Sequence, residues 1–201
     1  MKKLLSEKVL LNNILPYALN QIVLEKITTG TQSISIEKGT FEVTICGAGG
    51  GGGGSATSHS WLGSNGGSGA AFKGIVKFPR TTLTITVGNG GSAGAASGRN
   101  AGAGSNGTAS SIIQGSTNLI TAGGGNGGYG TGNGSGANNG KGGILTVGSI
   151  EIISEIIRKD GVQYSTVSIL GNGYGGGGAA RASNSGTKGQ NGYLKIIYKG
   201  K

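Results

Sequence analysis

The sequence predicts an all-β fold, an antiparallel sandwich that carries glycine-rich segments at the ends of its strands. Two observations predict it: stretches with alternating apolar and polar residues recur along the chain, and several run directly into glycine clusters. The most informative junction is residues 41–46, FEVTIC, followed by seven glycines within residues 47–54. With 201 residues, 47 glycines and 34% hydrophobic residues, the chain suits one domain with a modest core and a short appendage.

The N-terminal part differs from the rest because residues 2–27 are nearly free of glycine. Its apolar residues fall at the spacing of a helical stripe, which Pro16 interrupts, so we expect a helix, a break and a second helix over residues 14–26. Residues 1–29 are thus predicted as a helical attachment or oligomerisation segment, ahead of a glycine-rich β domain over residues 30–201; the alternative is a helix packed on its own sandwich. The stripe that would form the oligomer contact consists of Leu4, Leu11, Leu15, Ala18 and Ile22.

The β domain is expected to contain short strands separated by turn signals. These favour a sandwich of jelly-roll or TNF-like type over a parallel sheet. A turn is expected at Pro79-Arg80, and a hairpin turn at residues 159–161. Strands are expected over residues 33–36, 41–46, 72–78, 81–87, 144–147, 151–157, 164–170 and 193–198, with brief returns to the core at 112–113 and 119–120.

The glycine tracts allow two interpretations. Polyglycine can form the extended left-handed polyproline II helix, which has no internal hydrogen bonds, so its amides must pair with neighbouring segments or with water. Without Cβ atoms such helices can lie close enough to bond laterally, and strands that anchor both ends would offset the entropy lost on ordering glycine. The other interpretation is a set of mobile loops.

The net charge of +10 is unevenly distributed. No acidic residue occurs between Val43 and Ile150, or after Asp160, and both stretches are net basic. Unpaired cations attract polyanions such as phosphorylated surface glycans, teichoic acid or nucleic acid. Equally, the charge could simply keep a glycine-rich surface soluble. Nucleic acid is the less favoured partner, because aromatic and basic residues are not interleaved as stacking platforms require.

No catalytic or cofactor-binding arrangement stands out, and we interpret the chain as non-enzymatic. The single histidine, His59, has no nearby carboxylate in sequence, and the single cysteine, Cys46, ends a strand. Glu151 and Glu155 fit a charged turn better than a catalytic pair. No His, Cys and Asp cluster has the spacing of metal ligands, so no metal and no cofactor is expected.

Candidate binding residues are the bulky or charged side chains that stand alone among Gly, Ser and Asn. Aromatic faces stack on sugars, and Asn, Ser and backbone amides hydrogen-bond to hydroxyl groups, so a glycan is a reasonable ligand. The alternative for each is a plug that fills a gap beneath the glycine segments. The candidates are His59, Trp61, Arg99, Tyr129, Lys141, Tyr174 and Arg181.

The order of these elements resembles the glycine-rich domain of bacteriophage tail-fibre and tail-tip proteins. The resemblance spans about residues 30–201 and rests on FEVTICGAGGGG at 41–52, GGSGAAF at 66–72, LTITVGNGG at 83–91, TAGGG at 121–125 and GQNGYLKIIY at 189–198. It implies a β scaffold displayed on a virion that contacts a host surface. The N-terminal segment lies outside the resemblance.

We therefore expect a virion structural and receptor-binding protein, a tail fibre or tail tip, that contacts a glycan or an outer-surface protein of the host. It is expected to form a homo-oligomer and to have other tail proteins as partners. Polar residues interrupt any signal-peptide core near the N-terminus, so synthesis in the host cytoplasm is expected, and no stretch has the length of a membrane span. The alternative is a cellular surface or extracellular matrix protein in which the same domain is purely structural. Ice binding is disfavoured because the threonines lie in ordinary strands.

Overall fold

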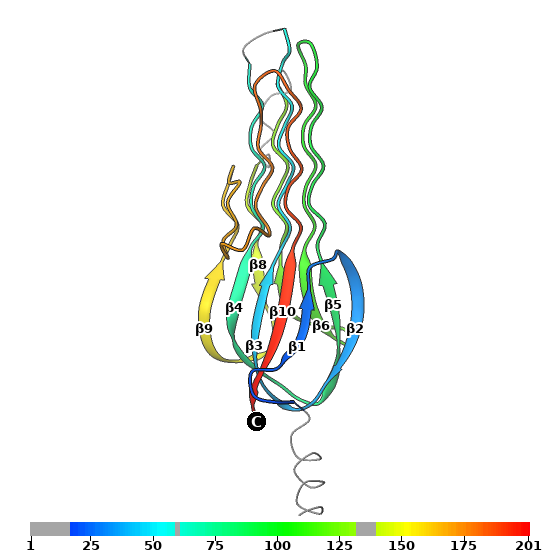
Figure 1. The fold of residues 1–201 in the computed structure, drawn as a ribbon, viewed down its shortest axis with the longest axis vertical. Helices are drawn as coiled ribbons and strands as arrows, with labels where there is room; N and C mark the ends of the chain where they lie inside the picture. Colours follow the sequence, from blue (N-terminus) through cyan, green and yellow to red (C-terminus); the bar gives the residue numbers. More distant parts are fainter. Residues whose placement is uncertain (1–16, 59–60, 132–139) are drawn as a thin grey trace, which may run out of the picture.

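The computed structural model describes residues 17–58, 61–131 and 140–201. All regular structure in these ranges is β-strand, arranged as two five-stranded antiparallel sheets, which confirms the predicted antiparallel sandwich (Figure 1). The first sheet has the order β1-β10-β3-β4-β9 and the second β2-β5-β6-β7-β8. The strands are β1 (Ile22–Lys26), β2 (Gly30–Ile36), β3 (Gly39–Cys46), β4 (Ala71–Phe78), β5 (Thr81–Val87), β6 (Ser110–Gln114), β7 (Thr117–Ala122), β8 (Leu145–Val147), β9 (Glu151–Lys159) and β10 (Tyr193–Gly200).

The core lies between the two sheets and follows from the alternation in the sequence. In β3, Phe41, Val43 and Ile45 are fully buried, whereas the residues between them face outward and stay partly exposed. In the opposite sheet Leu83 and Ile85 of β5 are buried in the same cluster. Each strand therefore contributes one apolar face, and the two faces form a single core.

The helix expected over residues 14–26 is wrong where the structure describes it. Ile22–Lys26 is strand β1, which pairs antiparallel with β10, and Ala18 lies in a turn closed by the Gln21 amide and the Ala18 carbonyl at 2.9 Å. The open edge of β10 offers backbone partners to a segment that contains β-branched Ile22 and Val23. Leu4, Leu11 and Leu15 lie outside the described residues. The division of the chain at residue 29 remains a prediction.

The strand expected over residues 164–170 is also wrong, and residues 159–161 do not form the expected hairpin turn. After β9 the chain joins the glycine-rich segments, since Gly161 donates to the carbonyl of Gly143 at 2.7 Å. Tyr164 has a φ of 52°, which a continuous strand cannot accommodate. Ile169 and Leu170 instead pack over the small buried cluster of Cys46, Ala71 and Tyr193.

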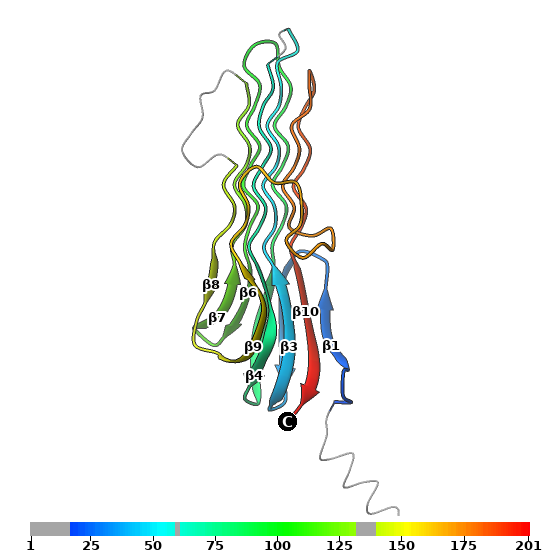
Figure 2. The same ribbon diagram turned by 90° about the vertical axis from the view of Figure 1, so that its left-hand side faces the viewer.

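The glycine-rich segments extend from one end of the sandwich and run side by side away from it (Figures 1 and 2). The β2–β3, β4–β5, β6–β7 and β8–β9 turns, together with the C-terminus, lie at the opposite end, whereas the β1–β2 connection lies at the bundle end (Figures 1 and 2). We call the glycine-rich segments the bundle and the end with the C-terminus the base of the sandwich. Within the described ranges no helix has both the length and the apolar character needed to cross a membrane.

Candidate functional site: a glycine bundle with a basic tip

One glycine-rich segment, residues 47–55, forms the axis of the bundle, and we call it the central helix. Its consecutive amides donate to three different neighbours in strict rotation, as a helix with three residues per turn requires. The donor–acceptor distances lie between 2.9 and 3.1 Å. The amides of Gly47, Gly50 and Gly53 donate to the carbonyls of Ala70, Gly67 and Ser64, respectively. Those of Ala48, Gly51 and Gly54 donate to Thr108, Ser105 and Gly102. Those of Gly49, Gly52 and Ser55 donate to Gln190, Thr187 and Asn184.

Three further segments donate to the carbonyls of the central helix, so that it has six neighbours. Gly91, Gly125 and Gly178 donate to Gly49, Ala48 and Gly50 at 2.9, 2.9 and 2.7 Å. The six neighbours also hydrogen-bond to one another around the axis, and antiparallel segments alternate with parallel ones. They comprise residues 64–70, 123–131, 101–108, 88–95, 184–192 and 175–179, in order around the axis. Of the two expected interpretations, the structure therefore has ordered, polyglycine II-type helices.

This lateral packing explains the glycine content directly. A Cβ atom placed on any glycine of the central helix would lie closer than 3.0 Å to the backbone of a neighbouring segment, which real Cβ atoms do not do. The antiparallel neighbours have glycine where they face the axis: added Cβ atoms on Gly66 and Gly69, or on Gly186 and Gly189, would contact carbonyl oxygens of the central helix. Glycines of the parallel neighbours, such as Gly125, would instead contact other outer segments. The three-residue spacing of the axis-facing glycines is a sequence signal for the array.

Polar side chains complete the hydrogen bonding where an outer amide has no carbonyl opposite it. Asn106 accepts from the Gly127 amide at 2.9 Å, Asn191 from Gly90 at 3.0 Å, and Ser64 from Tyr129 at 2.9 Å. Further such acceptors are Asn65, Ser68, Ser105, Thr108 and Thr187. The sequence suggested that Asn and Ser side chains would hydrogen-bond to the hydroxyl groups of a ligand. In the structure these side chains accept hydrogen bonds from amides of the bundle.

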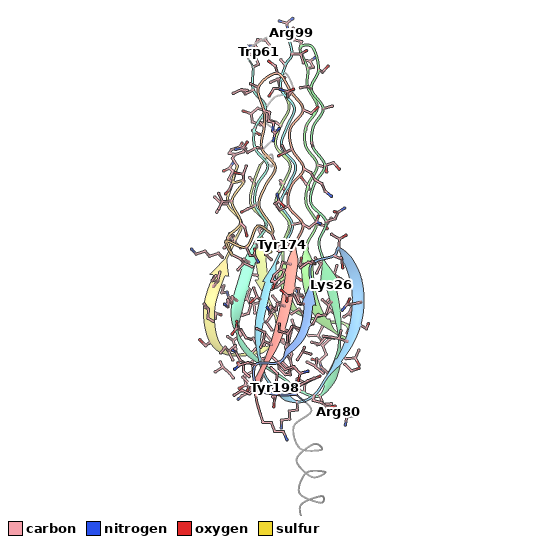
Figure 3. The ribbon with its side chains drawn as sticks, viewed as in Figure 1. Lys26, Trp61, Arg80, Arg99, Tyr174 and Tyr198 are labelled. Atoms are coloured by element: carbon pink, nitrogen blue, oxygen red, sulfur yellow. The ribbon has the colours of Figure 1, made fainter. Side chains whose placement is uncertain are left out.

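The far end of the bundle, which we call the tip, includes residues 57–58, Trp61 and the chain reversals near residues 97–101 and 181–185. The amides of Thr57 and Ser58 donate to the carbonyls of Ser97 and Gly98 in the first reversal at 2.9 and 3.3 Å. The two reversals are joined by the Ala96 amide, which donates to Ser185 Oγ at 3.0 Å. At this tip the Arg99 guanidinium carbon lies 5.8 Å from the centroid of the Trp61 ring (Figure 3). Trp61 remains 47% exposed there.

The described acidic residues are confined to the sandwich, whereas cations lie on both parts of the molecule. The bundle carries Arg99, Lys141, Arg181 and Lys188 and no acidic residue. The ion pairs between described residues join side chains of the sandwich only. Glu42, for example, contacts Lys73 at 3.4 Å and Lys199 at 3.2 Å. Burial raises the pKa of Glu42, but the hydrogen bond from Lys199 and the charges of both lysines outweigh it, and the net pKa is lowered.

Comparison with protein families agrees with this architecture. A family model described as a glycine-rich domain matches residues 27–200. The chain belongs to this glycine-rich domain family. A comparison with curated proteins found no match.

The structure separates the candidate binding residues of this glycine-rich domain into different places. Trp61 and Arg99 lie together at the tip, and Arg181 is exposed on a neighbouring reversal. Tyr129 is half-buried in one outer helix, and Lys141 is exposed on the segment beside it. Tyr174 lies where the bundle meets the sandwich and stacks on Tyr193, with ring centroids 5.0 Å apart (Figure 3). His59 lies outside the described residues.

The junction below the bundle is a buried, non-reactive cluster. Tyr193 donates its hydroxyl to Glu25 at 2.7 Å; this hydrogen bond lowers the pKa of Glu25, and burial raises the pKa of Tyr193. Burial raises the pKa of Cys46 to about 12, so its thiol stays protonated at neutral pH and is a poor nucleophile.

Glu151 and Glu155 of β9 form ion pairs with Lys77 and Arg158, respectively. Within the described ranges, no group of three His, Cys, Asp or Glu side chains could hold a metal ion.

Proposed function

We propose that this glycine-rich domain is a non-enzymatic binding protein whose tip contacts an anionic polymer on a host cell surface. The observation that carries the proposal is the absence of acids from the bundle: it bears cations without a single acidic residue, and Trp61 and Arg99 meet at its far end. The cations of the bundle attract an anionic polymer without competition from neighbouring carboxylates, whereas several cations of the sandwich are paired with its acids.

The construction of the bundle supports this role. Binding is stronger when the loops of the binding protein are held in place before they contact the ligand, because less conformational entropy is lost on binding. Here the reversals at the tip are continuous with helices whose amides are bonded to neighbours along their length. Trp61 offers an aromatic face for a sugar ring, and Arg99 and Arg181 offer guanidinium groups that suit phosphate or carboxylate.

We propose further that the protein acts in a virion, as part of a tail fibre or tail tip made in the host cytoplasm. This part of the proposal rests on the resemblance in the order of strands and glycine tracts from residue 30 onward. Genes for tail or lysis proteins beside the gene for this chain would support it. A neighbourhood of cell-envelope genes would instead favour a cellular surface or matrix protein.

Substitution at the tip tests the binding role. We expect Trp61→Ala and Arg99→Ala each to weaken binding of the full chain to teichoic acid or lipopolysaccharide by about tenfold, since central aromatic and arginine residues dominate such contacts. Binding should also weaken as salt rises, because exposed charges are screened. Surface plasmon resonance against a panel of purified anionic and neutral bacterial polysaccharides measures both effects.

Arg80→Ala is the matched control, because Arg80 is exposed at the base, the end opposite the tip (Figure 3). This variant should bind like the parent chain. Unchanged binding by both tip variants, or equal binding to neutral and anionic polymers, would contradict the proposal.

A further inference from the structure

The sandwich has four edge strands: β1 and β9 in the first sheet, and β2 and β8 in the second. An open edge presents unpaired backbone amides and carbonyls, which can pair with a strand of another chain. Register shifts and charged side chains both hinder such pairing, and both occur in β1 and in β9. The edge of β8 is only three residues long. Strand β2 differs from all three.

Strand β2 has a long, regular edge without any of these features. Its seven residues, GTQSISI, pair with β5 from Gly30 to Ile36 without a register shift, and they include no charged residue and no proline. Within the described ranges β5 is its only neighbour in the sheet, and no further backbone hydrogen bond involves these seven residues. Figure 1 shows β2 at the outer side of the sandwich. The other edge of β2 is therefore open to a second strand.

The sequence of β2 suits antiparallel pairing with an identical strand. When a twofold axis passes beside Ser33, this residue lies opposite Ser33 of the second copy, Thr31 lies opposite Ser35, and all seven residues are paired. The first charged residue after β2, Glu37, then lies opposite the uncharged Thr29 of the second copy. The pairing therefore places no like charges opposite each other.

Contacts already present on the outer face of β2 favour this register. The hydroxyl oxygen of Thr31 lies 2.9 Å from that of Thr86, and the hydroxyl oxygen of Ser35 lies 3.2 Å from that of Thr82. In the register centred on Ser33, Thr31 and Ser35 of different copies become neighbours, so the two hydroxyl pairs join into one row across the contact. Cross-strand pairs of threonine and serine stabilise β-sheets.

We propose that β2 pairs antiparallel with β2 of a second copy, so that the second sheets of two chains form one continuous sheet. The dimer has a twofold axis perpendicular to this sheet. Because the strands run along the long axis of the molecule (Figure 1), the two bundles point in opposite directions, and each end of the dimer carries a tip. This contact is distinct from the N-terminal helical stripe that the sequence predicts for oligomerisation.

Disulfide trapping in the full chain tests both the pairing and its register. Ser33→Cys should form disulfide-linked dimers under mild oxidation at least tenfold faster than Ser35→Cys. Directly opposite residues have Cα atoms about 5 Å apart, whereas the two copies of residue 35 would be about 14 Å apart, beyond the reach of a disulfide. Ser33 and Ser35 are both exposed on β2, so Ser35→Cys is a matched control. The native Cys46 is buried and does not compete.

A mixture of two variants provides a second test of the register. Neither Thr31→Cys nor Ser35→Cys should cross-link with itself, but an equimolar mixture should form the disulfide-linked heterodimer, because residues 31 and 35 lie opposite each other in the proposed pairing. Non-reducing gels and mass spectrometry identify the products. Equal dimer yields for Ser33→Cys and Ser35→Cys, or no cross-linking of any variant, would overturn the proposal.

Sedimentation equilibrium measures the dimer without cysteine chemistry. Ser33→Lys should weaken dimerisation at least tenfold, because it places two like charges opposite each other at the twofold axis. Thr146→Lys adds the same charge at an exposed position of β8, the other edge of the same sheet, and should dimerise like the parent chain. A monomeric parent chain, or a dimer that Ser33→Lys leaves intact, would contradict the proposal, whatever the tip binds.

Discussion

Replacing Gly51 with alanine should lower the free energy of unfolding by about 3 kcal/mol, because a new methyl group in a closely packed interior forces neighbouring backbone apart. Gly51 lies in the middle of the central helix, and its added Cβ would meet the carbonyl oxygen of Ser92 and the backbone of Gly91. Those atoms belong to a segment held by its own lateral bonds, so they cannot move without breaking others. Denaturant unfolding followed by circular dichroism measures the change.

Gly98→Ala is the matched control for this prediction. Gly98 lies in a reversal at the tip, and an added Cβ would meet nothing within 4 Å. Its backbone has no positive φ, so alanine should be tolerated and the free energy of unfolding should change by less than about 0.5 kcal/mol. If the two variants were equally stable, the close lateral packing of the central helix would be refuted.

The second large effect is expected in the sandwich core. Phe41→Ala should reduce the free energy of unfolding by about 3–5 kcal/mol, the usual range for removing a buried phenylalanine. Phe41 is fully buried, and its ring contacts those of Tyr17, Phe78 and Tyr198. Loss of this ring opens a cavity at the base, and because the bundle is anchored in the same strands, both parts should unfold in one transition.

Ile153→Ala is a suitable control for the core variant. Ile153 lies in the edge strand β9 and is 50% exposed, so its truncation should change the free energy of unfolding by about 0.5 kcal/mol or less. Thermal unfolding of both variants, monitored by near- and far-UV circular dichroism, compares them. A Phe41→Ala protein as stable as Ile153→Ala would mean that the ring cluster does not hold the base together.

Much of the sandwich is predictable from the sequence because its strands show a clear period of two. Residues 41–46 and 81–87 alternate cleanly, and the structure places them in β3 and β5. The helix predicted for the N-terminal segment is wrong because Ala18 and Ile22 match a helical stripe by spacing alone. Strand formation by Ile22–Lys26 depends on the free edge of β10, which no local pattern reveals.

The bundle was only partly predictable. The sequence shows that glycine tracts run between anchored strands, but the choice between ordered helices and mobile loops depends on lateral partners far apart along the chain. Gly49, for instance, bonds to Gln190, and Gly51 bonds to Ser105. The three-residue spacing of the axis-facing glycines is visible in the sequence, although the register between segments is not.

The same limitation applies to the candidate site. Trp61 and Arg99 were both recognisable as isolated bulky residues, but only the folded bundle brings these two distant residues together at one tip. Tyr174 looked equally isolated in sequence. It lies instead against Tyr193 at the junction, because residues 161–174 fold back over the sheet rather than forming a strand.

Amide hydrogen exchange of the central helix tests the main claim most directly. If residues 47–55 are bonded laterally to six neighbours, their amides should exchange as slowly as those of β3 and far more slowly than those of the tip near residues 97–101. Mass spectrometry of short peptic fragments resolves these segments. Slow exchange throughout residues 47–55 is the predicted result, and exchange as fast as that of the tip would contradict it.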